Sequence, residues 1–559
     1  MSEFDYIVVG AGSAGCVLAA RLAARPGTRV ALIEAGKRLR SPWLRVPLGF
    51  GRLVRNESVL WPYQTAPEPA LGGRRIAFPR GRLLGGSGSI NGLVFLRGAP
   101  GDYDAWEEAG AAGWSYRDVL PWFRRLERNL IADADRNYHG DDGPLPVSRI
   151  TPSPAARAFV HAAMEAGYPY NGDFNGASPY GAGFAPANME GGKRVSPADA
   201  YLRPALKSGA DIALFLSATV ERLEIAGRRV EGVLIRRPDG STEKLVARRE
   251  TILAAGVVNT PQLLMLSGIG PASELAGFGI PVIEDLPVGE GLQDHALARL
   301  SFRARNVVTL NRIVANPLRA GLAGLQYLLR RTGPLSVAAS EAVLMADLPG
   351  SRGSHTAPDV LIQFANFLIE DYQRGLSPED GFVYSVCLCR PESRGRVRLG
   401  GPSTEDAPII EANYFGVEED MERTVAGLRI LENLARQPSL ARIIERRVLP
   451  VRIESDDDLR AHIRETATTV FHPCGTCPMG TGQRAVVTPD LRLRGFDGLR
   501  IADASVMPSI PSTNIHAATI MIAERAAEMV QAAGHTAAAV HRDTRKPESW
   551  SSEPLSVTR

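Results

Sequence analysis

The fold is decided by the stretch Tyr6-Ile7-Val8-Val9-Gly10-Ala11-Gly12-Ser13-Ala14-Gly15, in which a short apolar run stops at a glycine-rich turn. The run predicts a buried parallel strand, and the residues after the turn predict a helix over 13–25. A second apolar run over 29–33 then ends at Glu34, nineteen residues after Gly15. Strand, turn, helix, strand and acid together form the full context of a dinucleotide-binding motif.

Each part of this motif has a physical role. Gly10 allows the tight turn, Gly12 lets the backbone approach a pyrophosphate, and Gly15 allows close packing of the helix on the strand. The helix N-terminus faces the anion, and Glu34 accepts hydrogen bonds from ribose hydroxyls while disfavouring a 2′-phosphate. The expected nucleotide contacts are Gly10, Gly12, Ser13, Ala14, Gly15, Glu34 and Ala35. An ordinary glycine turn is the alternative, and the complete context disfavours it.

The composition describes a globular protein of more than one domain. The chain has 559 residues, of which 44% are hydrophobic and 22% charged, and its formal net charge is only +3. Two domains are expected for this length. A small, scattered excess of arginine without a basic stripe argues against nucleic acid as a partner. No apolar run is long enough for a transmembrane helix, no signal peptide precedes the first strand, and cysteines are few, so we expect a cytoplasmic protein.

A second glycine-rich block covers residues 81–92. Its small residues would let backbone amides approach a flat or anionic ligand, although a flexible glycine loop is the alternative. The contacts expected from this block are Arg82, Gly85, Gly86, Ser87, Asn91 and Gly92.

Further along the chain, the apolar patterns divide between strands and helices. Residues 211–253 alternate as strands, and the last of these ends at Ala254-Ala255-Gly256 before a helix near Pro261. A stripe of leucines has helical spacing: Leu318, Leu322, Leu325 and Leu329. We expect this stripe to be the buried face of a helix, and the alternative is a contact with a membrane or a quinone. The run from Leu499 to Ser505 predicts a strand that closes on the acid Asp503, and a last helix is expected over 517–533.

Four blocks of this sequence, in this order, resemble the glucose-methanol-choline (GMC) family of FAD oxidoreductases. They are the motif with Glu34, the 81–92 block, Asn259 to Gly270, and the pair Phe471-His472-Pro473-Cys474-Gly475-Thr476 and Asn514-Ile515-His516. The resemblance implies bound FAD and oxidation of an alcohol by hydride transfer to the flavin. It also implies further FAD contacts at Val220, Ala255, Gly256, Asp503, Ala504, Asn514 and Ile515. Ile90 stands where several members carry a flavin-linked histidine, so we expect non-covalent FAD.

The resemblance also implies the architecture. An α/β, doubly wound Rossmann-like FAD-binding domain over 1–154, 194–310 and 462–534 is interrupted by a substrate-binding domain over 155–193 and 311–461. The latter is expected to be α+β, with an antiparallel sheet and helices. Residues 535–559, rich in Ser, Thr, Pro and Arg, are expected to lack fixed structure.

His472 is the expected catalytic base, because alcohol oxidation needs a group that takes the hydroxyl proton and imidazole titrates near neutrality. Asn514 matches the family position that hydrogen-bonds the substrate oxygen. His516 is the alternative second catalytic residue if the local alignment is shifted. In an extended Asn514–His516 segment only one of the two side chains can face the substrate.

Several other residues have competing interpretations. Cys474 and Cys477 lack the further ligands of a structural zinc site and the context of a redox pair, so we expect packing cysteines and no metal. Cys389 resembles the cysteine of flavin photodecarboxylases of fatty acids, which makes decarboxylation a remote alternative. Glu341 lies in a region where choline-oxidising relatives place a carboxylate for trimethylammonium, but a solvated or helix-capping role is commoner.

The expected function is therefore that of a choline-dehydrogenase-like alcohol dehydrogenase that passes electrons to a quinone or dye-type acceptor. An oxidase that makes hydrogen peroxide is the alternative, and a non-catalytic flavin-binding protein is a remote one. We expect a small-molecule alcohol as substrate, with peripheral membrane contact left open.

Overall fold

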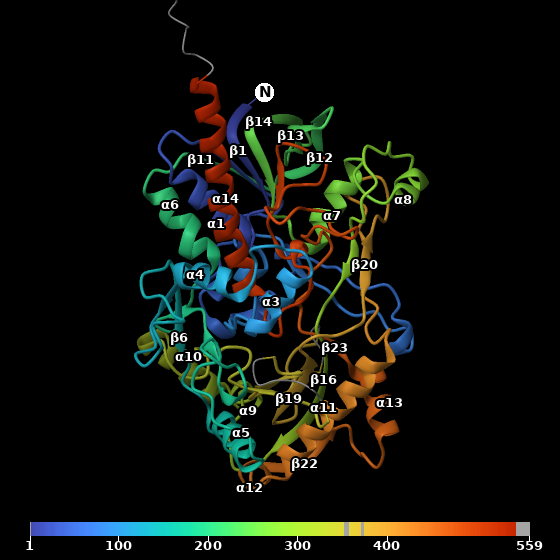
Figure 1. The fold of residues 1–559 in the computed structure, drawn as a ribbon. Helices are drawn as coiled ribbons and strands as arrows, with labels where there is room; N and C mark the ends of the chain where they lie inside the picture. The colour runs from blue at the N-terminus through green and yellow to red at the C-terminus, as the bar shows by residue number, and fades with distance from the viewer. Residues whose placement is uncertain (1, 351–356, 371–373, 544–559) are drawn as a thin grey trace, which may run out of the picture.

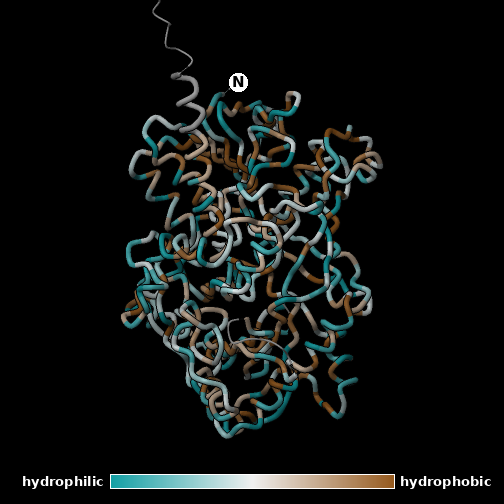
Figure 2. The backbone as a smooth tube through the Cα atoms, in the orientation of Figure 1, coloured by the Kyte–Doolittle hydropathy of each residue, from teal (hydrophilic) through white to brown (hydrophobic). Residues whose placement is uncertain are grey.

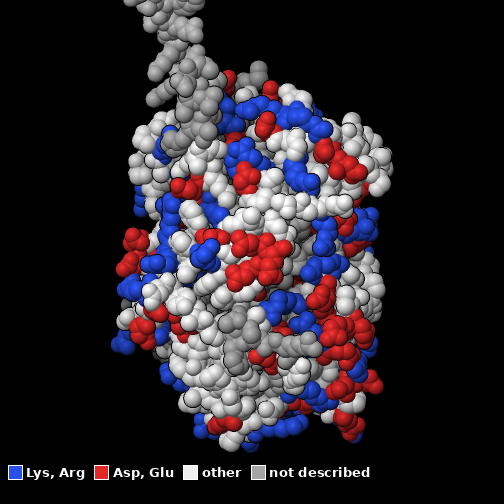
Figure 3. All heavy atoms as spheres, viewed as in Figure 1, with Lys and Arg blue, Asp and Glu red and all other residues white. Residues whose placement is uncertain are grey.

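Each half of the molecule is built on its own sheet, as the computed structural model shows (Figure 1). The structure describes residues 2–350, 357–370 and 374–543. Apolar segments run through the interior of both halves (Figure 2), and the buried residues form one large cluster around each sheet. Acidic and basic side chains are interspersed over the face seen in Figure 3. No helix in the described ranges is long and apolar enough to span a bilayer.

The first sheet carries the dinucleotide motif. Its parallel core has the order β11 (Ile212–Leu216), β2 (Val30–Glu34), β1 (Ser2–Val9), β14 (Thr242–Leu253), with β24 (Leu499–Ile501) also parallel to β14. Val8 pairs with Leu32 on one side and with Ile252 on the other. An antiparallel meander of β12 (Thr219–Ala226), β13 (Arg229–Arg236) and β14 extends it. The unbroken apolar run of β1 is explained by its central position, buried on both faces.

Helices α1 (Ser13–Ala23) and α14 (His516–Asp543) pack against each other beside this sheet (Figure 1). Helix α7 (Gly256–Leu266) follows β14 directly. The carboxyl ends of β1, β2 and β14 therefore lie at one edge of the sheet, where α1, the loop after Glu34 and α7 begin. Doubly wound sheets bind ligands at this edge.

The second sheet is antiparallel throughout. Its order is β22 (Ile444–Leu449), β16 (Ala296–Ala304), β19 (Gly381–Leu388), β18 (Val360–Ala365), β17 (Ala342–Ala346), β7 (Gly181–Phe184), with β23 (Thr468–Thr469) paired to β16. Helices α5 (Pro154–Glu165), α11 (Glu418–Arg436), α12 (Pro438–Ala441) and α13 (Asp456–Thr466) pack against it or one another.

The remaining elements connect or cover the two sheets. The helices are α2 (Phe50–Leu53), α3 (Pro100–Glu108), α4 (Tyr116–Leu126), α6 (Arg203–Lys207), α8 (Ala272–Gly277), α9 (Leu310–Val314) and α10 (Pro317–Arg330). The short strands are β3 (Leu60–Trp61), β4 (Arg80–Gly81), β5 (Glu127–Asn129), β6 (Leu145–Arg149), β8 (Pro186–Ala187), β9 (Met189–Glu190), β10 (Lys193–Arg194), β15 (Glu290–Leu292), β20 (Gly395–Arg398) and β21 (Ile409–Glu411).

Three details differ from the sequence-based expectations. The leucine stripe of α10 points outward, so the predicted buried face is wrong: the helix packs through Ala323 and Tyr327 instead. Strand β16 belongs to the second sheet, although 194–310 was expected in the FAD-binding part, because an apolar strand pattern does not specify its sheet. Helix α14 continues to Asp543, into the predicted unstructured tail, through an alanine-rich segment with high helix propensity. Residues 544–559 lie outside the described residues.

Candidate active site

A cavity of about 680 Å³ runs from the dinucleotide motif to the second sheet. It is lined by most of the predicted cofactor and catalytic residues: Gly10, Gly12, Ser13, Ala14, Glu34, Ala35, Gly86, Ser87, Asn91, Gly92, Val220, Ala255, Gly256, His472, Asp503, Ala504, Asn514, Ile515 and His516. The predicted contacts Gly15, Arg82 and Gly85 are not among the residues that line it. The cavity is therefore shared by the two halves.

Two glycines of the motif, Gly10 and Gly15, leave no room for a side chain. Gly10 has a φ of +96°, and a Cβ there would lie 2.5 Å from the Ala254 carbonyl oxygen. A Cβ on Gly15 would lie 1.8 Å from the Gly10 oxygen, which agrees with its expected role in packing. A Cβ on Gly86 would lie 2.8 Å from Gly12 Cα, so the second glycine block rests directly on the first. Gly85 joins them by donating its N–H to the Ala11 carbonyl over 2.7 Å.

The Glu34 carboxylate lies at the end of β2 and is buried. Its two oxygens accept the backbone N–H groups of Ala11, at 2.9 Å, and Gly36, at 2.8 Å. Burial raises the pKa of Glu34 to about 7 against the effect of these hydrogen bonds. The carboxylate is thus held in one orientation, at the cavity wall.

Asp503 has a different local role from Glu34. Its Oδ2 accepts the N–H of Gly256 at 2.8 Å and the hydroxyl of Thr260 at 2.7 Å, so it holds the first turn of α7. Its Oδ1 accepts the Ser505 N–H at 2.8 Å. Asp503 therefore joins the ends of β14 and β24 where they meet the cavity.

These residues fit an FAD. Two glycine turns form a cradle that a Cβ would fill, the N-terminus of α1 opens into the cavity, and a fixed carboxylate stands beside it at the end of β2. Ile90 lines the same cavity and offers no nucleophile. Residues of the motif, the 81–92 block and the loop after β24 would hold the cofactor.

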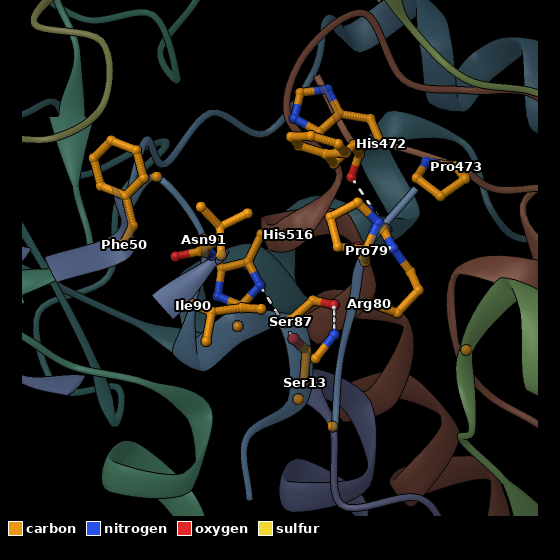
Figure 4. Close-up of a pocket in the computed structure, with 18 of the residues that line it drawn as sticks. Ser13, Phe50, Pro79, Arg80, Ser87, Ile90, Asn91, His472, Pro473 and His516 are labelled. Carbon is orange, nitrogen blue, oxygen red and sulfur yellow. Dashed lines mark hydrogen bonds between the residues drawn. The ribbon is translucent and has the colours of Figure 1, made fainter. Parts of the chain in front are cut away.

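His472 lies on the loop after β23 and is buried (Figure 4). Asp294 fixes this loop, because its Oδ1 accepts the His472 N–H at 2.8 Å while its Oδ2 accepts the hydroxyls of Tyr414 and Thr469, both at 2.5 Å. Arg80 donates to the Phe471 carbonyl at 3.3 Å. His472 is therefore held by β23 of the second sheet and the residues just before β16, with Tyr414 and Arg80 contributing from outside that sheet.

The imidazole of His472 lies in a chain of hydrogen bonds that sets its tautomer. His295 Nε2 is 3.1 Å from the Cys389 carbonyl oxygen, which can only accept, so Nε2 carries the proton and Nδ1 is an acceptor. His295 Nδ1 is 3.1 Å from His472 Nδ1, which must then be the donor. The lone pair of His472 lies on Nε2, 3.0 Å from Asn514 Nδ2.

The environment keeps this imidazole neutral. Burial lowers the pKa of His472 well below its usual range, and the neighbouring His295 and Arg80 lower it further. Burial also lowers the pKa of His295 to about 4. A neutral imidazole with its free lone pair towards the cavity can accept a proton. Sequence reasoning missed His295, Asp294 and Arg80, and the only local signal was an acid next to a histidine at the start of a strand.

His516 occupies a different place from His472. It begins α14, and its Nδ1 is 3.3 Å from the Ser13 hydroxyl at the start of α1 (Figure 4). Burial, together with the charge of Arg194, lowers the pKa of His516 to about 4. The structure thus brings Asn514, and not His516, to the His472 imidazole.

The far end of the cavity is walled by the second sheet and its loops. Its lining includes Leu297, Arg299, Leu310, Val314, Ser340, Gln363, Ala365, Phe367, Val383, Ser385 and Val470. Among the described lining residues the only carboxylates are Glu34 and Asp503, both at the nucleotide end. Glu341 faces elsewhere, accepting the Ser153 N–H at 2.6 Å. Cys389 is fully buried in the core and contributes its carbonyl to His295, while Cys474 and Cys477 are buried free thiols.

Comparison with known proteins agrees with this geometry. The GMC oxidoreductase family models match residues 4–297 and 391–523. An alcohol dehydrogenase [acceptor] of Pseudomonas putida is 39% identical over 94% of this chain and 95% of its own. The mitochondrial choline dehydrogenase of Mus musculus is 37% identical over 96% of this chain and 90% of its own length.

Solved structures give the same result. Pyridoxine 4-oxidase from Mesorbium loti superposes with a TM-score of 0.85 at 30% identity, covering 95% of this chain and 99% of that one. Formate oxidase superposes with a TM-score of 0.89 at 26% identity, and the match covers 96% of this chain and 99% of the formate oxidase chain. The chain therefore belongs to the GMC oxidoreductases, FAD-dependent enzymes that oxidise CH–OH groups.

Proposed function

We propose that this enzyme dehydrogenates an uncharged alcohol, with His472 as the base and non-covalently held FAD, and that the electrons then pass to a quinone or dye-type acceptor. The observation that carries the proposal is the 3.0 Å contact between Asn514 Nδ2 and His472 Nε2 at the cavity. FAD, when bound, supplies the acceptor for the hydride.

The protein residues handle the proton. The substrate hydroxyl would replace the Asn514 amide as the donor to His472 Nε2, and Asn514 Nδ2 would then donate to the substrate oxygen. His472 Nε2 takes the hydroxyl proton while Nδ1–H stays bonded to His295. Burial disfavours the imidazolium that this proton transfer would form. We therefore expect the substrate carbon to lose its hydride in the same step as, or immediately after, the transfer of the hydroxyl proton.

The substrate class follows from the far end of the cavity. A trimethylammonium group would meet Leu297, Val383 and Phe367 there, and no carboxylate of the described residues lines that end to balance its charge. An uncharged alcohol with an apolar body fits the same wall. Glu341, the residue considered for choline, is engaged with Ser153.

A matched pair of substrates tests this choice. Choline and 3,3-dimethyl-1-butanol have nearly the same shape and differ in the positive charge. With purified holoenzyme and a dye acceptor, we expect kcat/KM for the neutral alcohol to exceed that for choline by about tenfold or more, equivalent to about 1.4 kcal/mol. A preference for choline of that size would refute the assignment.

Oxygen is the second candidate acceptor, and it is supported by the solved oxidases of similar fold. Peroxide release in air, compared with dye reduction under argon at the same alcohol concentration, separates the two. We expect dye reduction to be much the faster. Peroxide formation at an equal rate would make the enzyme an oxidase.

A further inference from the structure

Helix α10 exposes a stripe of leucines to the outside. Leu318, Leu322, Leu325 and Leu329 are 79, 65, 52 and 75% exposed, and Leu328 is 66% exposed. These residues recur at helical spacing on the side opposite the packed residues Ala323 and Tyr327. A continuous apolar stripe on a surface helix has a cost in water that single exposed leucines do not have, so it indicates an interaction surface.

The direction of the stripe is fixed by the fold. The Asn316 side chain caps the helix, accepting the Arg319 N–H at 3.1 Å. The Tyr327 hydroxyl donates to the Gly192 carbonyl at 3.1 Å from the opposite face. The helix is therefore attached to the lower half of the molecule (Figure 1) with its leucines held outward.

The charged residues of the segment that carries the stripe have one sign. Residues 306–335 contain Arg312, Arg319, Arg330 and Arg331 and no Asp or Glu. Arg312 lies 3.9 Å from Asp380, whereas no carboxylate of the described residues forms an ion pair with Arg319 or Arg330. Arg319 and Arg330 flank the stripe along one side of the helix. Apolar side chains beside unpaired arginines fit a surface that is apolar inside and anionic at its edge.

The same segment reaches the cavity. Helix α9, which directly precedes α10, contributes Leu310 and Val314 to the cavity lining, and Val314 is itself 54% exposed. Arg52 and Arg55, which are exposed, line the cavity as well. The helix that carries the stripe thus directly follows a helix that lines the cavity.

We propose that α10 and Val314 dock this enzyme on the surface of an anionic lipid bilayer, with the leucines in the headgroup and upper acyl region and Arg319 and Arg330 on lipid phosphates. A second copy fits the face less well, because a twofold contact through 306–335 would bring arginines together with no acid in the segment to pair with them. A bilayer supplies both the apolar layer and the negative charge.

Vesicle flotation of the holoenzyme tests the proposal. The vesicles are phosphatidylcholine alone, or phosphatidylcholine with about one third phosphatidylglycerol. We expect the wild type to float with the anionic vesicles and to be released as salt is raised. The double variant L322S/L329S should bind at least about tenfold more weakly, and R319A/R330A should lose the preference for phosphatidylglycerol.

The matched control is Val451→Ser, since Val451 is 81% exposed and lies after β22, outside residues 306–335. It should bind like the wild type. Flavin content and flavin reduction by a water-soluble alcohol should be unchanged in every variant, because none of these residues contacts the proposed reacting groups. That readout keeps this proposal separate from the proposed function.

Three results would overturn the docking proposal. The wild type could remain unbound with both kinds of vesicle. Binding could be unaffected by L322S/L329S, or lost equally in V451S. A wild-type dimer without vesicle binding, converted to a monomer by L322S/L329S, would assign the face to a second copy.

Discussion

Replacing His472 by alanine should slow alcohol-dependent flavin reduction by about 10² to 10⁴-fold, the usual contribution of a positioned general base. That factor corresponds to about 2.7 to 5.4 kcal/mol of transition-state stabilisation. The structure supports the full effect, because Nε2 carries the lone pair and lies 3.0 Å from the Asn514 amide at the cavity. FAD binding should survive, since the glycine turns and Glu34 lie at the other end of the cavity.

The assay is anaerobic stopped-flow reduction of bound flavin, followed at about 450 nm, where oxidised flavins absorb. His472→Gln serves as a second variant, because it can retain a hydrogen bond to Asn514 if the alanine variant folds poorly. His516→Ala is the matched control: it removes a histidine from the same cavity, but one that contacts Ser13 and not Asn514. Reduction of His472→Ala at near the wild-type rate, or a larger loss in His516→Ala, would refute the reasoning.

Three further predictions follow from the site. Glu34→Gln should weaken FAD binding by about 1 to 3 kcal/mol through loss of a charge-assisted hydrogen bond, measured by titrating apoprotein, and unchanged affinity would mean that another residue holds the ribose. Acid precipitation should release FAD into the supernatant, because Ile90 cannot form a covalent bond; yellow colour in the pellet would contradict this. Since only neutral His472 can accept the proton and its pKa is lowered, flavin reduction should stay constant down to pH 6.5 or below and fall only at more acid pH.

Local sequence motifs predicted the fold of the nucleotide-binding half of this protein correctly. Tyr6 to Gly15 and Glu34 specify a strand, a turn, a helix and an acid that follow one another within one βαβ unit, so their spacing is informative. His472 and Asn514 were singled out by resemblance, and their contact across 42 positions could not be obtained from local pattern. His295 was missed for the same reason: it reaches His472 only because β23 pairs with β16.

The leucines of α10 were misassigned for a physical reason. Helical periodicity shows that a stripe exists, and it does not say whether the stripe faces the core or an external apolar phase. Small residues at Ala320 and Ala323 let the opposite face approach the protein, so the larger leucines were left outside. The absence of acid in 306–335 was the available signal.

The division of the site between the two halves explains how one family fold can keep its chemistry while its substrate changes. His472 is fixed by Asp294, and Asp294 is held by Thr469 of β23 and by Tyr414, so the proposed base is attached to the second sheet, whose strands also line the far end of the cavity. Asn514 instead lies just before α14, which packs on the first sheet through α1. Side chains of β16, β18 and β19 can therefore change without disturbing the glycine turns, whereas a change in how the two sheets pack together would alter the 3.0 Å contact on which the proposed proton removal depends.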